Sequence, residues 1–160
     1  MKNVSIVLCL LLLFSANSRT QSVDEEIARA VMAAPPAMAA DVTVVRLADD
    51  GSREVVRSGS NGLVCYDRSN EPGRDFSAQC TSVANLPRAG QNHMVWMSSA
   101  NANEAKAVFD AQESDGSREA PEFGSVWYTL AGSDQIAARA NSPHITIAVP
   151  FSTSDTLGLP

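Results

Sequence analysis

Few side chains in this sequence suit acid–base or nucleophilic chemistry at neutral pH. The histidines are His93 and His144, and the cysteines beyond the first ten residues are Cys65 and Cys80. A hydrolase needs a nucleophile, a general base and a group that orients the base. The best such set that the spacing allows uses His144 as the general base.

This hydrolase hypothesis draws its other members from the residues around His144. The nucleophile would be Ser133 or Ser142, and the orienting carboxylate would be Asp134 or Asp155. No Gly-x-Ser-x-Gly elbow presents either serine, so nothing predicts an oxyanion hole. We therefore expect a structural hydrogen-bonding role for His144 and assign no catalytic residue.

Other chemical motifs are missing from the sequence. It contains no Walker loop, Gly-x-Gly-x-x-Gly or His-Glu-x-x-His. The acidic pair Asp49 and Asp50 lacks the later ligands of a calcium loop. Eighteen acidic residues offer candidates for a glycosidase pair without selecting one. We expect neither a cofactor nor a metal.

The N-terminus has the pattern of a secretory signal peptide. Lys2 precedes an apolar run at 4–14, and small and polar residues follow at 15–18. The run is too short to span a bilayer, which favours cleavage before Arg19 over the alternative of an uncleaved anchor. We expect residues 1–18, with Cys9, to be removed and the protein to be secreted or periplasmic.

Cys65 and Cys80 are expected to form a disulfide, because exported proteins fold in oxidising compartments. A redox pair would favour Cys-x-x-Cys spacing. A zinc site would need two further ligands from a chain with only two histidines. The disulfide is therefore preferred to both alternatives.

The charge of the chain argues against polyanionic partners. The net charge is −6, and removal of Lys2 leaves 11 basic against 18 acidic side chains, a net charge of −7. Nucleic acid and anionic membranes attract clustered Lys and Arg, and only Lys106 would remain as a lysine. We expect no nucleic-acid partner and no membrane association after cleavage, and leave a small-molecule or protein partner open.

The first half of the chain predicts a helix and three strands. A helix over 24–33 should end at the prolines 35–36. Strand-like runs at 42–47 and 53–57 flank an Asp-Gly turn, and a third at 63–66 should complete a meander. The sequence thus predicts residues 19–40 as a helix and Pro-rich connection, and 41–160 as one domain.

The middle of the chain is less clear. Residues 67–79 are expected to form a surface loop and 81–91 a connection. A short helix is expected at 93–97. Asn101 should cap a further helix at 102–112, with Glu104 three residues on.

Two alternating runs near the C-terminus predict a hairpin at about 125–149. One set should be buried against the helices: Val126, Tyr128, Leu130, Ile145, Ile147 and Val149. The other set should lie on a half-covered face and form the candidate binding surface: Trp127, Thr129, His144 and Thr146.

These elements together predict an α+β domain. Its sheet should be antiparallel, with two or three helices on one face and one disulfide. The first functional hypothesis is a non-catalytic binding or structural module, and the second is the small hydrolase using His144.

The order of motifs resembles a group of small bacterial exported proteins of unknown function. The resemblance lies in Ser60-Asn61-Gly62-x-x-Cys65, the loop to Cys80, and the closing Pro143-His144-Ile145-x-Ile147-x-x-Pro150 strand. Leu63 stands where that group more often has an aromatic residue. The resemblance implies export and no particular activity.

Overall fold

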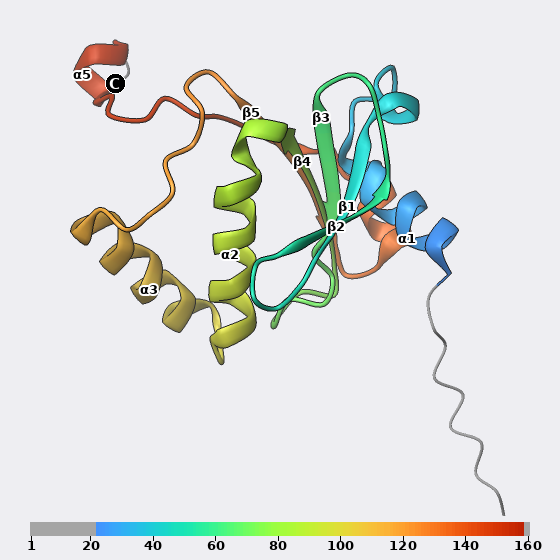
Figure 1. Ribbon diagram of the computed structural model, residues 1–160, viewed down its shortest axis with the longest axis horizontal. Helices are drawn as coiled ribbons and strands as arrows, with labels where there is room; N and C mark the ends of the chain where they lie inside the picture. Colours follow the sequence, from blue (N-terminus) through green and yellow to red (C-terminus); the bar gives the residue numbers. More distant parts are fainter. Residues whose placement is uncertain (1–21, 159–160) are drawn as a thin grey trace, which may run out of the picture.

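The computed structural model describes residues 22–158, so the predicted signal peptide lies outside the described residues. Its centre is a six-stranded mixed sheet in the order β2-β1-β3-β4-β5-β6 (Figure 1). The strands are β1 (Thr43–Leu47), β2 (Arg53–Arg57), β3 (Leu63–Asp67), β4 (Phe76–Ser82), β5 (Val126–Gly132) and β6 (His144–Ile147). The α+β class is confirmed.

Helices cover both faces of the sheet, which corrects the expectation of helices on one face (Figure 1). The α-helices are α1 (Val23–Ala30), α2 (Leu86–Ser98), α3 (Ala102–Asp115), α4 (Gln135–Ala140) and α5 (Ser154–Leu157), and the 3-10 turns are η1 (Val31–Ala33), η2 (Ala39–Asp41) and η3 (Val83–Asn85). α1, η1 and α4 pack on one face and α2 on the other, with α3 against α2. The central strands carry apolar side chains on both faces, so one layer of helices could not bury them.

The expectation of a purely antiparallel sheet is wrong at one pairing. β2 pairs with β1 as predicted, but β3 lies on the other side of β1 and runs parallel to it. β3 is buried along four of its five residues, whereas β2 carries exposed charges at Arg53 and Glu54. Burial therefore places β3 inside the sheet and β2 at its edge.

Two elements differ from the predicted loop and connection. β4 occupies the end of the predicted loop, where Phe76, Ala78 and Cys80 alternate with more polar residues. α2 is one helix of 13 residues, where only 93–97 was expected to be helical. Pro87 is tolerated because it lies in the first helical turn, where its missing N–H has no intrahelical partner.

Glycine in the middle of α2 is explained by a close contact between two backbones. A Cβ on Gly90 would lie 2.4 Å from the carbonyl oxygen of Gly51, in the turn between β1 and β2. Gly51 itself has φ of +80°, as the predicted Asp-Gly turn requires. Gly90 thus lets α2 contact the hairpin.

We expect Gly90→Ala to destabilise the protein by about 1 to 3 kcal/mol, although alanine is the better helix former, because the added methyl group overpacks this contact. Urea unfolding measures the change. Met94→Ala, at an exposed position of the same helix, is the control. Unchanged or increased stability of Gly90→Ala would contradict the close approach.

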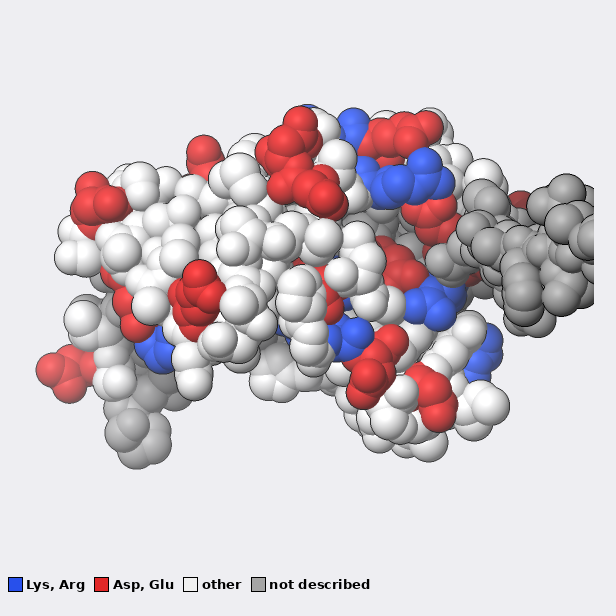
Figure 2. Space-filling model, turned by 90° about the horizontal axis from the view of Figure 1, so that it is seen from below, with Lys and Arg blue, Asp and Glu red and all other residues white. Residues whose placement is uncertain are grey.

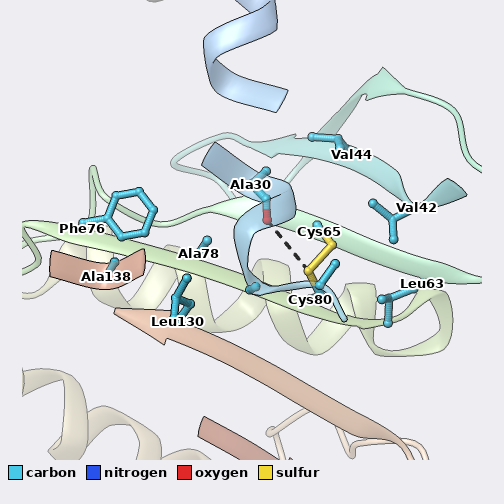
Figure 3. Packing of buried hydrophobic residues seen from close by; sticks show 12 residues of the cluster. Ala30, Val42, Val44, Leu63, Cys65, Phe76, Ala78, Cys80, Leu130 and Ala138 are labelled. Atoms are coloured by element: carbon cyan, nitrogen blue, oxygen red, sulfur yellow. Dashed lines mark hydrogen bonds between the residues drawn. A yellow bond between two sulfur atoms is a disulfide. The ribbon is translucent and has the colours of Figure 1, made fainter. Parts of the chain in front are cut away.

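The disulfide joins Cys65 of β3 to Cys80 of β4, which lie directly opposite each other in the antiparallel register. Both cysteines are fully buried in the core beneath α1 (Figure 3). The Cys80 sulfur lies 3.8 Å from the carbonyl oxygen of Ala30, at the end of α1. The predicted disulfide is therefore present and lies at the contact between the sheet and α1.

The C-terminal hairpin is present, but the burial of its two faces departs from the prediction. Ile145 and Ile147 are exposed, because α1, η1 and α4 cover the sheet only as far as β5. Trp127 on the opposite face is 8% exposed and belongs to the core beneath α2. Trp127 is therefore a buried core residue, although its face of the hairpin was expected to be only half covered.

Candidate functional site: a groove between α2 and the sheet

A groove of about 310 Å³ opens between α2, the connection after α3, and the sheet. Its floor comes from β4, β5, and residues 146–148 in and just after β6, and its walls come from α2 and residues 118–121. The lining residues are Gln79, Arg88, Asn92, Arg118, Pro121, Trp127, Thr146 and Ala148. Apolar and polar groups thus meet in one concavity, as in small-molecule sites.

A chain of hydrogen bonds fixes the amide on the groove floor. The Tyr66 hydroxyl donates to Gln79 Oε1 over 2.6 Å, and Gln79 Nε2 donates to Thr129 Oγ1 over 2.8 Å. Burial raises the pKa of the Tyr66 phenol, so its hydroxyl stays protonated and able to donate. The Gln79 side chain is therefore held in one orientation.

Two arginines lie in the groove wall. Arg118 donates to Asn92 Oδ1 over 2.5 Å and to Gln112 Oε1 over 3.2 Å. Its guanidinium also lies 4.1 Å from the centre of the Phe109 ring. Burial and the charge of nearby Arg88 lower the pKa of Arg118. The wall therefore holds two positive charges close together.

The four predicted binding residues divide between the groove and the sheet edge. Trp127 and Thr146 line the groove, and Thr129 accepts the hydrogen bond from the Gln79 amide. His144 lies exposed on the edge strand and is not part of the groove lining. The prediction named no groove residue from α2 or the α3–β5 connection, because spacing along the chain does not indicate which helix covers a strand.

A second polar cluster joins the loop between β3 and β4 to α2. Glu71 is 2% exposed, and its carboxylate accepts from Arg68 over 2.7–3.0 Å and from Arg74 Nε over 2.7 Å. His93 Nδ1 lies 3.1 Å from Glu71 Oε1, and Arg74 lies over the Trp96 ring. The cluster fastens the loop to α2, and the Arg-x-x-Glu-x-x-Arg spacing was the signal for it in the sequence.

The protonation of this cluster follows from its geometry. A carboxylate only accepts hydrogen bonds, so His93 Nδ1 carries the proton between the two groups. Burial alone would raise the pKa of Glu71, but the hydrogen bonds from His93 and Arg68 and the charges of Arg68 and Arg74 lower it to about 2. Glu71 is therefore ionised in the folded protein at neutral pH.

We expect the Glu71 cluster to make folding sensitive to acid. The unfolded chain protonates Glu71 near its ordinary pKa of 4.5, whereas the folded protein does so near 2. Because the folded pKa is the lower one, the stabilisation is complete above about pH 4.5 and disappears as the pH falls to about 2. The loss should be about 2 to 3 kcal/mol.

Urea unfolding at a series of pH values measures this loss. The matched control is Glu71→Gln, whose free energy of unfolding should lack this part of the acid dependence. Equal slopes in the two proteins between about pH 4.5 and pH 2 would contradict the assignment.

A larger cleft of about 630 Å³ lies between α1, β1 and the β3–β4 loop. Its lining is wholly polar: Glu26, Arg29, Arg46, Asp67, Ser69, Asn70 and Asp75. Arg29 pairs with Asp67 over 2.6 Å and Arg46 pairs with Glu26, so the charges largely neutralise one another. Figure 2 shows basic and acidic side chains interspersed on the underside of the protein. The residues that line the cleft include no aromatic or aliphatic side chain, whereas the groove is lined by Trp127, Pro121 and Ala148.

The comparisons with known proteins gave no identification. No family model, curated protein or solved structure matches the chain. Among residues 22–158, no helix has the length and apolar character to cross a membrane. Within the same residues, no group of three or more His, Cys, Asp or Glu side chains is arranged to hold a metal ion. Function is therefore inferred from the groove itself.

Proposed function

We propose that the protein is an exported, non-catalytic module that binds a small molecule in the groove between α2 and the sheet. The observation that carries this proposal is the convergence of Trp127, Gln79 and Arg118 in one concavity. A volume of about 310 Å³ is close to the lower end of the range for ligand pockets, roughly 300–1,000 Å³. The ligand is correspondingly small.

The polar groups of the groove are arranged before any ligand binds. Gln79 is fixed between Tyr66 and Thr129, and Arg118 is fixed by Asn92 and stacked on a phenylalanine ring. Side chains that are already ordered lose little entropy on binding. This arrangement favours specific binding of a small molecule over loose surface adsorption.

The hydrolase alternative gains less support from the geometry. The His144 side chain lies exposed on the edge strand β6, whereas a general base needs a nucleophile held within reach. Asp134, one candidate for the orienting carboxylate, instead accepts from the N–H of Ala137 and caps α4. Binding without catalysis is therefore the preferred proposal.

Support for export comes from the signal-like pattern of residues 1–18 and from the disulfide, which suits an oxidising compartment. We expect the mature chain to begin at Arg19. Intact mass spectrometry of the protein recovered from the medium or the periplasm tests this. A mass that includes residues 1–18 would contradict the proposal of cleavage.

Ligand-observed NMR with a fragment library tests the binding proposal. Thr146→Trp should block the groove, because Thr146 lines it and is exposed on an edge strand. Ile147→Trp is the matched control, since the neighbouring residue is exposed on the opposite face of the same strand. Fragments should bind the wild type and Ile147→Trp but not Thr146→Trp. Absence of binding, or equal binding to all three proteins, would refute the groove as the site.

A further inference from the structure

Two arginines of the groove share one carboxylate oxygen from α3. Glu113 Oε1 lies 2.9 Å from Arg88 Nη2 and 3.3 Å from Arg118 Nε. The arginine side chains are 18% and 8% exposed, whereas that of Glu113 is 58% exposed. The two cations thus belong to the wall of the groove, whereas Glu113 contacts both of them from α3 and is not among the residues that line the groove.

Glu113 does not satisfy this pair of cations. One carboxylate faces two guanidinium groups, which leaves an excess positive charge at the wall. The oxygens that accept from Arg118, on Asn92 and Gln112, belong to neutral amides. Within residues 22–158, the buried Nε of Arg118 has no hydrogen-bond partner of good geometry, although Glu113 is near it. A buried donor of this kind favours a better-placed acceptor.

We infer that the ligand of the groove carries a carboxylate, which replaces Glu113 between Arg88 and Arg118 while its apolar part lies against Trp127. This inference rests on the proposed function. Glu113 acts here as an internal competitor that occupies the anion position when no ligand is bound. The volume of the groove limits the apolar part to about one or two rings.

The energetic balance favours this exchange. An exposed ion pair contributes little, because solvent screens it and the exposed side chain loses freedom by forming it. A carboxylate inside the groove would be less screened, and its hydrogen bonds with guanidinium groups would be charge-assisted and bidentate. The free energy lost by releasing Glu113 to solvent should therefore be smaller than the free energy gained from the contacts of the ligand carboxylate.

The probes for the test are indole-3-acetate and indole-3-acetamide, which have nearly the same shape and differ in charge. Titration of the ¹⁵N-labelled protein, followed through the indole N–H signal of Trp127, measures both affinities. We expect the acetate to bind roughly tenfold more tightly than the amide, as the loss of a charge-assisted pair predicts.

Variants of the charged residues assign the effect to this position. Glu113→Gln removes the competitor and should raise the affinity for the acetate roughly threefold to tenfold, with no change for the amide. Arg88→Gln should lower the affinity for the acetate by a similar factor. The control is Asp110→Asn, an exposed carboxylate on the same helix that pairs with Lys106, because it makes the same change in net charge.

The outcomes separate this inference from the proposed function. Equal binding of the two probes, or an acetate affinity that Glu113→Gln does not raise above that of Asp110→Asn, overturns the anion inference and leaves the groove as a binding site. Binding of neither probe also overturns it. In that case the fragment comparison between Thr146→Trp and Ile147→Trp decides whether the proposed function falls as well.

Discussion

Glu71→Gln is expected to lower the free energy of unfolding by about 3 to 5 kcal/mol, the range for breaking a buried ion pair. The carboxylate of Glu71 is the acceptor for both Arg68 and Arg74. The Arg68 side chain is 9% exposed and cannot regain full hydration when its partner is lost. The variant leaves two positive charges beneath the loop without a compensating anion.

The loss should appear in urea unfolding at pH 7 as a lower midpoint with an unchanged slope. Glu54→Gln is the matched control, since Glu54 is 69% exposed and pairs with Arg46 at the surface. That change should cost less than about 1 kcal/mol. A similarly small loss for Glu71→Gln would show that the loop is held to α2 by other contacts, such as the stacking of Arg74 on Trp96.

Removal of the disulfide by the double substitution Cys65→Ala and Cys80→Ala should cost roughly 3 kcal/mol. The two cysteines are 15 residues apart, and the cross-link reduces the conformational entropy of the unfolded chain by an amount set by that loop. Alanine suits both positions because they are completely buried and would not accept an unpaired hydroxyl group. The loss is large for a domain of this size.

Chemical unfolding of the wild type with and without a reductant provides an independent measurement. Reduction should lower the stability by about as much as the double substitution. Alkylation of the unreduced, unfolded mature protein should add no mass, because no thiol is free. A modified Cys65 or Cys80, or a double variant as stable as the wild type, would contradict the role of the cross-link.

Some elements were predictable because the residues that determine them lie close together in the chain. The Asp-Gly turn between β1 and β2, the Asn101 cap of α3 and the helix ending before Pro35 depend on a few neighbours each. The capping amide does accept from the N–H groups of Asn103 and Glu104. These features depend on near neighbours in the chain more than on the rest of the fold.

β4 was missed in the prediction, although its residues alternate with the period of a strand, because the segment before it is rich in polar and turn-forming residues. The alternation of Phe76, Ala78 and Cys80 has the period of a strand, but the polar run before it favoured a loop. α2 was shortened in the prediction because Pro87 and Gly90 usually interrupt helices. Pro87 is tolerated in α2 because it lies in the first turn, which the sequence can indicate. Gly90 is required by its contact with Gly51, which only the folded structure shows.

The sequence alone determined the disulfide pair, the turn between the first strands, the capped helix and the alternation of the last two strands. The tertiary structure decided that β3 joins β1 in parallel, that helices cover both faces, and that Arg88 and Arg118 meet in one wall. The physical reason is the distance along the chain between the residues that interact. Turns, caps and periods arise from dihedral preferences and hydrogen bonds between near neighbours, whereas strand order and the groove depend on which distant apolar faces can be buried together.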